Sequence, residues 1–263
     1  MAPAADSGAP VKRWAVVTGA SSGIGLAFAR QLAAEGWSLV LTARRLDRLR
    51  DFASSNAGVP VEVFEDDLEE PDAPRRLFEF TESKGIFAEL LINNAGFGTF
   101  GELRELALDR QLAMVQVNCS AVVALTRLYL PGMIQRRGGD ILIVASTASF
   151  QGVPYQCTYA ATKAFDLIFA EGLAEEVKRH GVRVCALCPG QTKSEFHEVA
   201  NEPIPGVMSV HSAEEVAKIG LAALRSGKRF AIPGVSNRLG MEIQRFLPRR
   251  LVTSMSEKLF RPR

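Results

Sequence analysis

Short apolar runs alternate with longer amphipathic segments along almost the whole chain. The apolar runs have the length and the bounding Gly and Pro residues of buried strands, and the segments between them have helical spacing. The pattern predicts strands at 13–20, 37–45, 59–67, 88–96, 139–146, 182–190 and 228–234. It predicts helices at 24–36, 46–55, 71–85, 103–133, 155–181 and 211–227. The segment 103–133 is either one long helix or two joined helices.

This order of elements predicts the fold class. Strands that alternate with helices are joined by right-handed crossovers, which place the strands in one parallel sheet with helices on both faces. We therefore expect an α/β fold, a single doubly wound (Rossmann) domain of about seven strands over residues 12–236. Residues 1–11 are rich in Ala, Pro and Gly and lack the apolar core of a signal peptide, which indicates a flexible arm. Residues 237–263 form a basic C-terminal extension.

Composition agrees with this fold and excludes some partners. The chain has 263 residues, of which 47% are hydrophobic, enough for one large globular domain. It has 31 basic and 29 acidic residues and shows no clustered basic face of the kind that binds nucleic acid. A run of about 18 apolar residues is not found, so no membrane-spanning helix is expected.

The cysteines and histidines allow more than one interpretation. Cys185 and Cys188 form a C-x-x-C pattern in VCALCPG, which is typical of a redox pair or half of a zinc site. Apolar flanks and the lack of a second such pair favour small residues that fill a buried strand. Reduced thiols suit the cytoplasm, where we expect the protein. His180, His197 and His211 lie far apart, and no metal site is predicted.

A glycine-rich turn joins the first predicted strand to the first helix. The stretch TGASSGIG, residues 18–25, has the spacing G-x-x-x-G-x-G. Glycine permits a tight turn and a close approach to a pyrophosphate, and the helix N-terminus adds free N–H groups and a positive dipole end. A plain Gly-rich turn has the same composition, but the position directly after the first strand favours a dinucleotide site.

Several spaced motifs occur in order along the chain. They are TGASSGIG at 18–25, NNAG at 93–96, Ser146, YAATK at 159–163 and PG at 189–190. Together they resemble the short-chain dehydrogenase/reductase family, over a region from about residue 12 to about residue 235. The spacing of the glycines is similar to that of the shorter-chain oxidoreductase branch of the family.

The resemblance implies a catalytic tetrad of Asn118, Ser146, Tyr159 and Lys163. Reduction of a ketone by hydride makes an alkoxide that needs a proton, and a free tyrosine has a pKa near ~10. A lysine ammonium favours the phenolate, so Tyr159 is expected to be the general acid and base and Lys163 its tuner. Ser146 would hydrogen-bond the carbonyl oxygen, and Asn118 would hold a water that links Lys163 to solvent. A lone Tyr or Ser on such elements would be structural in most proteins.

The end of the second predicted strand bears on the cofactor. NAD-preferring members of the family usually have an acid there, whereas this chain reads LTARR, with Ala43 followed by Arg44 and Arg45. A guanidinium pairs well with the 2′-phosphate of NADP, so NADP(H) is predicted over NAD(H). The alternative is that both arginines are solvated at a helix start. The resemblance places these residues at the cofactor: Gly19, Ser21, Ser22, Gly23, Ile24, Gly25, Arg44, Arg45, Asp67, Leu68, Asn94, Ala95, Gly96, Tyr159, Lys163, Pro189, Gly190 and Thr192.

Two features concern the substrate. Relatives often have Gly shortly after the catalytic Ser, where this chain has Ser149, and the change affects the loop beside the substrate. Aromatic residues gather on segments next to the predicted site and suggest an apolar pocket, although some must belong to the core. They are Phe97, Phe100, Phe150, Tyr155 and Phe196.

The basic extension at 237–263 is partly amphipathic. It would pack as a solvated helix on an apolar edge, dock on another subunit, or lie on an anionic membrane surface. Since the family forms dimers and tetramers through its long helices, we expect a homodimer or a homotetramer.

The expected function is NADP(H)-dependent hydride transfer between nicotinamide and a small-molecule carbonyl or alcohol. Reduction of an apolar ketone, aldehyde or ketoacyl compound is the favoured direction. Two alternatives are an NADPH-binding sensor without turnover and a membrane-surface reductase of lipid ketones. The sequence leaves the substrate open, because the fold and the tetrad serve many chemistries.

Overall fold

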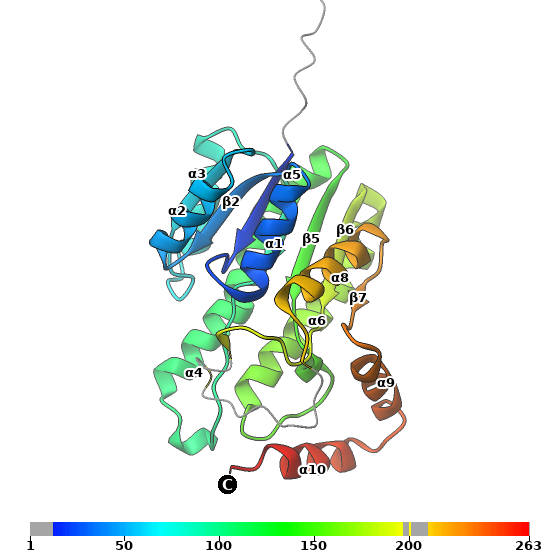
Figure 1. The fold of residues 1–263 in the computed structure, drawn as a ribbon. Coiled ribbons are helices and arrows are strands. Elements are labelled where there is room, and N and C mark those ends of the chain that lie inside the picture. The colour runs from blue at the N-terminus through cyan, green and yellow to red at the C-terminus, as the bar shows by residue number, and fades with distance from the viewer. Residues whose placement is uncertain (1–12, 197–199, 201–209, 263) are drawn as a thin grey trace, which may run out of the picture.

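The computed structural model describes residues 13–196, 200 and 210–262, and the predicted N-terminal arm lies outside this part. A seven-stranded sheet in the order β3-β2-β1-β4-β5-β6-β7 forms its centre (Figure 1). All its strand pairs are parallel. The strands are β1 Trp14–Thr18, β2 Ser38–Ala43, β3 Val61–Glu65, β4 Ala88–Asn93, β5 Gly139–Val144, β6 Val182–Leu187 and β7 Phe230–Ala231. The strand order reverses between β1 and β4, where doubly wound folds bind ligands.

Helices cover both faces of the sheet, as the alternating pattern predicts. The helices are α1 Gly23–Ala34, α2 Leu46–Ser55, α3 Ala73–Ser83, α4 Leu108–Val115, α5 Ala121–Gln135, α6 Cys157–Val177, α8 Ala213–Arg225, α9 Val235–Gln244 and α10 Arg249–Phe260. Apolar side chains of α1, α2 and α8 form one core with the sheet, and those of α3, α4, α5 and α6 form a second core. The N-terminus of α8 is capped by Ser212, whose Oγ accepts from the backbone N–H of Glu215 at 3.1 Å.

The predicted helix at 103–133 is a nearly continuous helical stretch with an irregular centre. Between α4 and α5 lies a π-helical turn, η2, at Gln116–Ser120. By length and composition the stretch Leu108–Gln135 is apolar enough to cross a membrane, which the sequence search for apolar runs did not predict. In this fold it packs on the sheet as a core helix, with Leu125 and Met133 fully buried.

The C-x-x-C residues lie in the core, which confirms the interpretation as a buried strand. Cys185 belongs to the core on one face of the sheet and Cys188 to the core on the other. Both are free thiols. Burial raises the pKa of Cys185 to about 12 and that of Cys188 further, so neither is a reactive thiolate at neutral pH.

The C-terminal extension forms two helices, α9 and α10, of which the sequence showed only the amphipathic character. They lie at the lower end of the molecule in Figure 1, beyond the carboxyl ends of the strands. Because ligands bind at this edge of a doubly wound sheet, the extension lies next to the candidate site.

Candidate active site

A cleft with a volume of about 470 Å³ opens at the carboxyl ends of the strands. Its walls come from the glycine turn, the ends of β2, β4 and β5, the loop after β6, and α6, α9 and α10. Every predicted cofactor residue except Gly25 lines this cleft, and so do Ser146, Tyr159 and Lys163 of the predicted tetrad. The structure therefore brings together residues that are spread over most of the chain.

Gly25 has a different role in the glycine turn. A side chain at this position would collide with the carbonyl oxygen of Gly19 and with the amide of Asn94. That amide donates to the backbone oxygen of Thr18 at 2.8 Å, and the Thr18 hydroxyl accepts from the N–H groups of Asn94 and Ala95, each at 3.0 Å. The turn and the end of β4 are therefore held together before any ligand binds.

Lys163 is buried at the bottom of the cleft. Its Nζ donates to the backbone oxygen of Val144 at 2.7 Å and to Oδ2 of Asp166 at 3.0 Å. Burial by itself lowers the pKa of Lys163, but the charges of Asp166 and Tyr159 outweigh burial and raise it. The lysine is therefore an ammonium held at a fixed position.

Asn118 lies beneath the cleft, within the π-helical turn η2. Its Nδ2 donates to the backbone oxygen of Phe97 and to the hydroxyl of Thr162, both at 3.0 Å, and its Oδ1 accepts from the N–H of Phe97 at 3.2 Å. A π-turn inserts one residue into a helix and redirects the side chains around it. Here it accompanies an amide that ties η2 to α6 and to the loop after β4.

Ser149 connects the loop that carries Ser146 to helix α6. Its hydroxyl donates to the backbone oxygen of Lys163 at 2.7 Å and accepts from the N–H of Ser146 at 3.3 Å. The Oγ of Ser146 accepts from the N–H of Ala148 at 3.1 Å, so its own proton remains to be donated. The residue that departs from the family pattern thus fixes the position of Ser146 relative to Lys163.

The aromatic pocket differs from the sequence prediction. Phe97 and Phe196 line the cleft, and the ring of Phe196 lies 5.3 Å from that of Tyr159. The prediction was wrong for the other three aromatics, which pack elsewhere. Phe150 lies against Phe230, and Phe100 lies against Tyr155, each pair at 6.1 Å between ring centres. Their place is taken by residues of the C-terminal helices, namely Asn237, Met241 and Phe260.

The other end of the cleft is rich in charge. Arg44 lies 3.2 Å from Glu69 and 3.6 Å from Asp67. Arg45 donates to the hydroxyls of Ser21 and Ser22 at 3.0 and 2.8 Å. The guanidinium of Arg45 therefore lies directly against the glycine turn.

A carboxylate that the sequence did not single out also binds this cluster. Glu195 accepts from Arg45 at 2.7 Å and from Arg48 at 2.6 Å. The hydrogen bonds from Arg48 and Arg45 lower the pKa of Glu195 to about 2. We call Arg44, Arg45, Arg48 and Glu195 the arginine end of the cleft, and Asn118, Ser146, Tyr159, Lys163 and Asp166 the catalytic end.

The residues present fit a nicotinamide dinucleotide. Bare glycine backbone faces the cleft at Gly96, where a Cβ would come within 3.3 Å of Lys163 Nζ and 3.1 Å of Asn118 Oδ1. A helix N-terminus with two serine hydroxyls and a guanidinium lies at the opposite end, which suits phosphate. Among the described residues, no group of three or more His, Cys, Asp or Glu side chains is placed to hold a metal ion.

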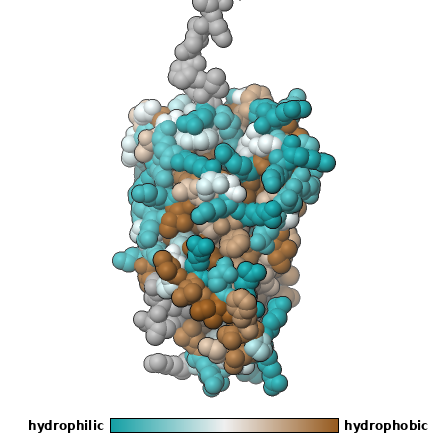
Figure 2. Space-filling model, turned by 90° about the vertical axis from the view of Figure 1, so that its right-hand side faces the viewer, coloured by the Kyte–Doolittle hydropathy of each residue, from teal (hydrophilic) through white to brown (hydrophobic). Residues whose placement is uncertain are grey.

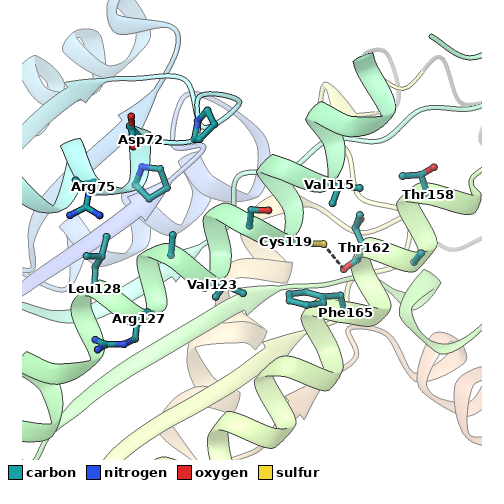
Figure 3. Close-up of a pocket in the computed structure, with 15 residues that line it drawn as sticks. Asp72, Arg75, Val115, Cys119, Val123, Arg127, Leu128, Thr158, Thr162 and Phe165 are labelled. Carbon is teal, nitrogen blue, oxygen red and sulfur yellow. Dashed lines mark hydrogen bonds between the residues drawn. The ribbon is translucent and has the colours of Figure 1, made fainter. Parts of the chain in front are cut away.

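A second cavity, of about 880 Å³, lies away from this chemistry on the outer side of α5 and α6. Figure 3 shows Val115 at the end of α4, Val123 on α5 and Phe165 on α6, with Asp72, Arg75 and Arg127 at one side. It contains none of the predicted site residues and is mainly apolar. It is a groove on the surface rather than part of the cleft.

Known proteins are similar to this chain in sequence and in fold. Residues 13–204 match the family model described as short chain dehydrogenase. A Myxococcus xanthus protein named as an uncharacterized oxidoreductase is 35% identical over 212 residues, which are 80% of this chain and 83% of that protein. A very-long-chain 3-oxoacyl-CoA reductase of Anas platyrhynchos is 31% identical over 226 residues, covering 81% of this chain and 71% of that protein.

A solved structure agrees with these relatives. The short-chain dehydrogenase from Sphingobium yanoikuyae in complex with NADPH superposes with a TM-score of 0.80 at 28% identity, covering 92% of this chain and 95% of that one. The fold and the cleft at the carboxyl edge define a Rossmann-type oxidoreductase. The chain belongs to the short-chain dehydrogenase family.

Proposed function

We propose that the protein is an NADP(H)-dependent reductase of apolar carbonyl compounds, with Tyr159 as its general acid and base. The observation that carries the proposal is the arrangement of the catalytic end. Lys163 is buried and held against Val144, one helical turn from Tyr159, in a cleft that begins at the glycine turn. A buried ammonium beside a cleft-lining phenol suits proton transfer.

When bound, NADPH supplies the hydride. The hydroxyl of Ser146 donates a hydrogen bond to the carbonyl oxygen as negative charge develops, since its oxygen accepts from Ala148 and no acceptor for its proton is found among the described residues. Tyr159 then gives its proton to that oxygen. Lys163 has three N–H groups, of which two are directed to Val144 and Asp166. The third remains for the ribose hydroxyls of the cofactor.

The arginine end supports the preference for NADP(H). Arg44 and Arg45 follow directly after β2, and both line the cleft. Arg45 also reaches the serines of the glycine turn, so it is close to where phosphate groups would lie. The solved relative with NADPH agrees with this assignment.

The wall near Tyr159 supports an apolar substrate. Phe97, Phe196, Met241 and Phe260 all line the cleft. A ketoacyl compound would suit such a wall, and the relative named as a 3-oxoacyl-CoA reductase acts on that class by its name. Cytoplasmic localisation remains our expectation from the reduced thiols.

A dimer or tetramer is part of this proposal. The groove on α5 and α6 is apolar at its centre, with Val115, Val123 and Phe165 partly exposed. Its rim carries both Asp72 and the cations Arg75 and Arg127, so the same surface of a second copy would be complementary to it.

The experiment is NADPH oxidation by the purified protein with a panel of ketones, aldehydes and ketoacyl thioesters. NADH and the Tyr159→Phe variant are run in parallel. Turnover with NADPH that the variant loses supports the reductase. Tight NADPH binding without turnover on any carbonyl would instead favour the sensor.

A further inference from the structure

The catalytic end contains a buried carboxylate for which the predicted tetrad has no role. Asp166 lies on α6, three residues after Lys163, and its Oδ2 accepts from Lys163 Nζ at 3.0 Å. The side chains are 6% and 1% exposed for Lys163 and Asp166. The other oxygen, Oδ1, is buried and accepts no hydrogen bond from the described residues. Lys163 is therefore the main polar partner of Asp166.

We propose that Asp166 is a positioning residue that holds Lys163 in place and offsets its positive charge, and thereby keeps the hydroxyl of Tyr159 protonated at neutral pH. This inference rests on the proposed function, since it concerns the same proton donor. Geometry carries it: two opposite charges in contact, both shielded from water, one helical turn from the phenol.

The physical reason is the sign of the charges. A lone ammonium beside Tyr159 would favour the phenolate and lower the pKa of the phenol. A carboxylate 3.0 Å from that ammonium opposes this effect, and burial leaves little water to screen it. A protonated phenol is the form that gives a proton to an alkoxide. Asp166 therefore favours carbonyl reduction over alcohol oxidation near neutral pH.

The other titratable groups that face Lys163 and Asp166 do not reverse the effect of Asp166 on the pKa of Tyr159. Cys119 on η2 and Cys188 after β6 are the nearest thiols, and burial raises the pKa of both, so both remain neutral. Burial raises the pKa of Asp166 to about 6, although Lys163 lowers it in part. Asp166 is thus mainly ionised at neutral pH, and its effect on Tyr159 is lost as the pH falls through about 6.

The test is a direct titration of Tyr159, which needs no substrate. The chain has three tyrosines, so the ultraviolet absorbance of phenolate is simple to assign with the Tyr159→Phe variant as reference. Burial raises the pKa of Tyr129, and the hydrogen bond to Glu257 raises that of Tyr155, and subtraction of the Tyr159→Phe titration curve isolates the Tyr159 midpoint from both. In Asp166→Asn we expect the Tyr159 midpoint to fall by about one pH unit or more.

Two controls separate this role from a structural one. Glu176→Gln removes the same charge from an exposed position on α6 and leaves the midpoint unchanged. Asp166→Asn in a Lys163→Met background produces no shift, because the carboxylate acts through the lysine. That double variant also avoids a buried unpaired charge, and Lys163→Met alone is its reference.

An unchanged Tyr159 midpoint in Asp166→Asn, or a shift of equal size without Lys163, overturns the inference. Neither result touches the proposed function, which fails if the wild-type protein does not turn over carbonyl compounds or if Tyr159→Phe keeps that turnover. Where turnover is present, the pH profile of kcat/KM for alcohol oxidation moves in the same direction as the titration.

A separate observation concerns the outer surface of the C-terminal helices. On α9, Val235, Leu239 and Ile243 recur every fourth residue and are 85%, 58% and 51% exposed. Asn237 and Met241, on the other side of that helix, line the cleft. The inward side of α9 thus belongs to the site, while its outward side is apolar and faces solvent.

Helix α10 repeats this arrangement. Leu251, Met255 and Leu259 also recur every fourth residue and are 48%, 58% and 42% exposed, whereas Phe260 turns inward to the cleft. Phe246, between the two helices, is 87% exposed. Figure 2 shows the side of the molecule that lies at the right in Figure 1, and hydrophobic residues gather in its lower half, at the level of α9.

The charges on these helices indicate the partner. Their acidic residues, Glu242 and Glu257, each pair with the arginine that directly follows the same helix. The exposed cations without an ion-pair partner in the described part of the chain are Arg238, Arg249, Arg250 and Lys258. A second copy docked here about a two-fold axis would bring like charges together, whereas an anionic lipid surface complements them.

We infer that α9 and α10 form a docking surface for an anionic lipid bilayer, independently of any activity. The test is flotation of the full chain with vesicles of phosphatidylcholine alone and of phosphatidylcholine mixed with phosphatidylglycerol. We expect the wild-type chain to bind the mixed vesicles. A variant that combines Leu239→Ser, Ile243→Ser, Arg249→Gln and Arg250→Gln should bind them at least about tenfold more weakly.

Matched controls lie outside this surface. Phe87→Ser removes an apolar side chain that is 61% exposed at the start of β4, and Arg104→Gln removes an exposed cation. Neither change affects vesicle binding. Absence of wild-type binding to mixed vesicles overturns the inference. So does a fall in molar mass of the four-site variant in light scattering without any change in vesicle binding, since the surface would then join two copies of the chain.

Discussion

The two ends of the cleft differ in the burial of their charged and polar groups. At the catalytic end, Asn118, Lys163 and Asp166 are buried, with at most 5% of each whole residue exposed, and they bond to one another, to the Thr162 hydroxyl or to backbone. At the arginine end, the side chains of Arg44 and Arg45 are 58% and 40% exposed and pair with carboxylates of loops. The charges of one end are buried, whereas those of the other end are exposed to solvent.

This difference indicates where ligand binding requires a change of partners. Exposed ion pairs contribute about 0–1 kcal/mol, so a phosphate can replace Glu195 on Arg45 at small cost. Breaking a buried pair costs about 3–5 kcal/mol, so the catalytic end keeps its bonds throughout a reaction cycle. We therefore expect changes at the catalytic end to affect turnover strongly and changes at the arginine end to affect the choice of cofactor.

The largest effect is expected from Tyr159→Phe. The variant keeps the ring that contacts Phe196 and loses only the hydroxyl that we propose as the proton donor. We expect kcat for carbonyl reduction to fall by about 10²–10⁴-fold, with NADPH binding unchanged. Steady-state kinetics and cofactor fluorescence measure the two quantities. Turnover that survives in the variant would show that Tyr159 is not the acid.

A smaller and more selective effect is expected from Arg45→Ala. A hydrogen bond to a charged group contributes about 1.5–3 kcal/mol, so the KM for NADPH should rise by about 10–100-fold and the KM for NADH should barely change. Arg44→Asp should move the preference toward NADH, because a carboxylate there can bind the ribose hydroxyls.

Parallel measurements of kcat/KM with both cofactors test this end of the cleft. Arg13→Ala is the control, since Arg13 lies over Trp37 and does not line the cleft. If Arg44→Asp keeps its preference for NADPH, the assignment of these arginines is wrong.

Much of the catalytic end could be predicted from the sequence, for a physical reason. Ser146 follows a parallel strand, and Tyr159, Lys163 and Asp166 lie about one turn apart on α6, so the fold itself brings these positions together. Asp166 was missed although a signal existed, since it is a carboxylate within the apolar run AFDLIFA, one helical turn after Lys163. A charge at a buried helical position needs a partner, and Lys163 was the nearest.

The arginine end and the substrate wall could be predicted less completely. Arg44 and Arg45 follow a strand, whereas Glu195 reaches Arg48 from 147 positions away, through a loop whose course no local pattern determines. Likewise, periodicity does not tell which way a loop aromatic points, so Phe100 and Phe150 were assigned to the pocket incorrectly. Phe260 reaches the cleft from the last helix, far from any motif.

Glu195→Gln tests whether the carboxylate of Glu195 competes with NADPH at the arginine end. The carboxylate occupies the guanidinium groups of Arg45 and Arg48, so its removal should improve NADPH affinity by about 2–5-fold and leave NADH affinity unchanged. The arginine contacts hold the pKa of Glu195 at about 2, so the group stays ionised and the difference between variant and wild type should be constant across the neutral pH range. Titration calorimetry at several pH values measures both points. A loss of NADPH affinity would mean that Glu195 supports the cofactor instead of competing with it.

Ser149→Ala is expected to have the smallest effect, and it separates structure from catalysis within the catalytic end. The change removes the hydroxyl that donates to the backbone oxygen of Lys163 at 2.7 Å and accepts from the N–H of Ser146 at 3.3 Å. We expect a loss of about 1 kcal/mol in the free energy of unfolding and a Tm lower by about 2–4 °C. Ser54→Ala, on the exposed side of α2, should stay within about 0.5 kcal/mol of wild type. An unchanged Tm in Ser149→Ala together with a large loss of kcat would place Ser149 in the chemistry, and the catalytic end would then need a further member.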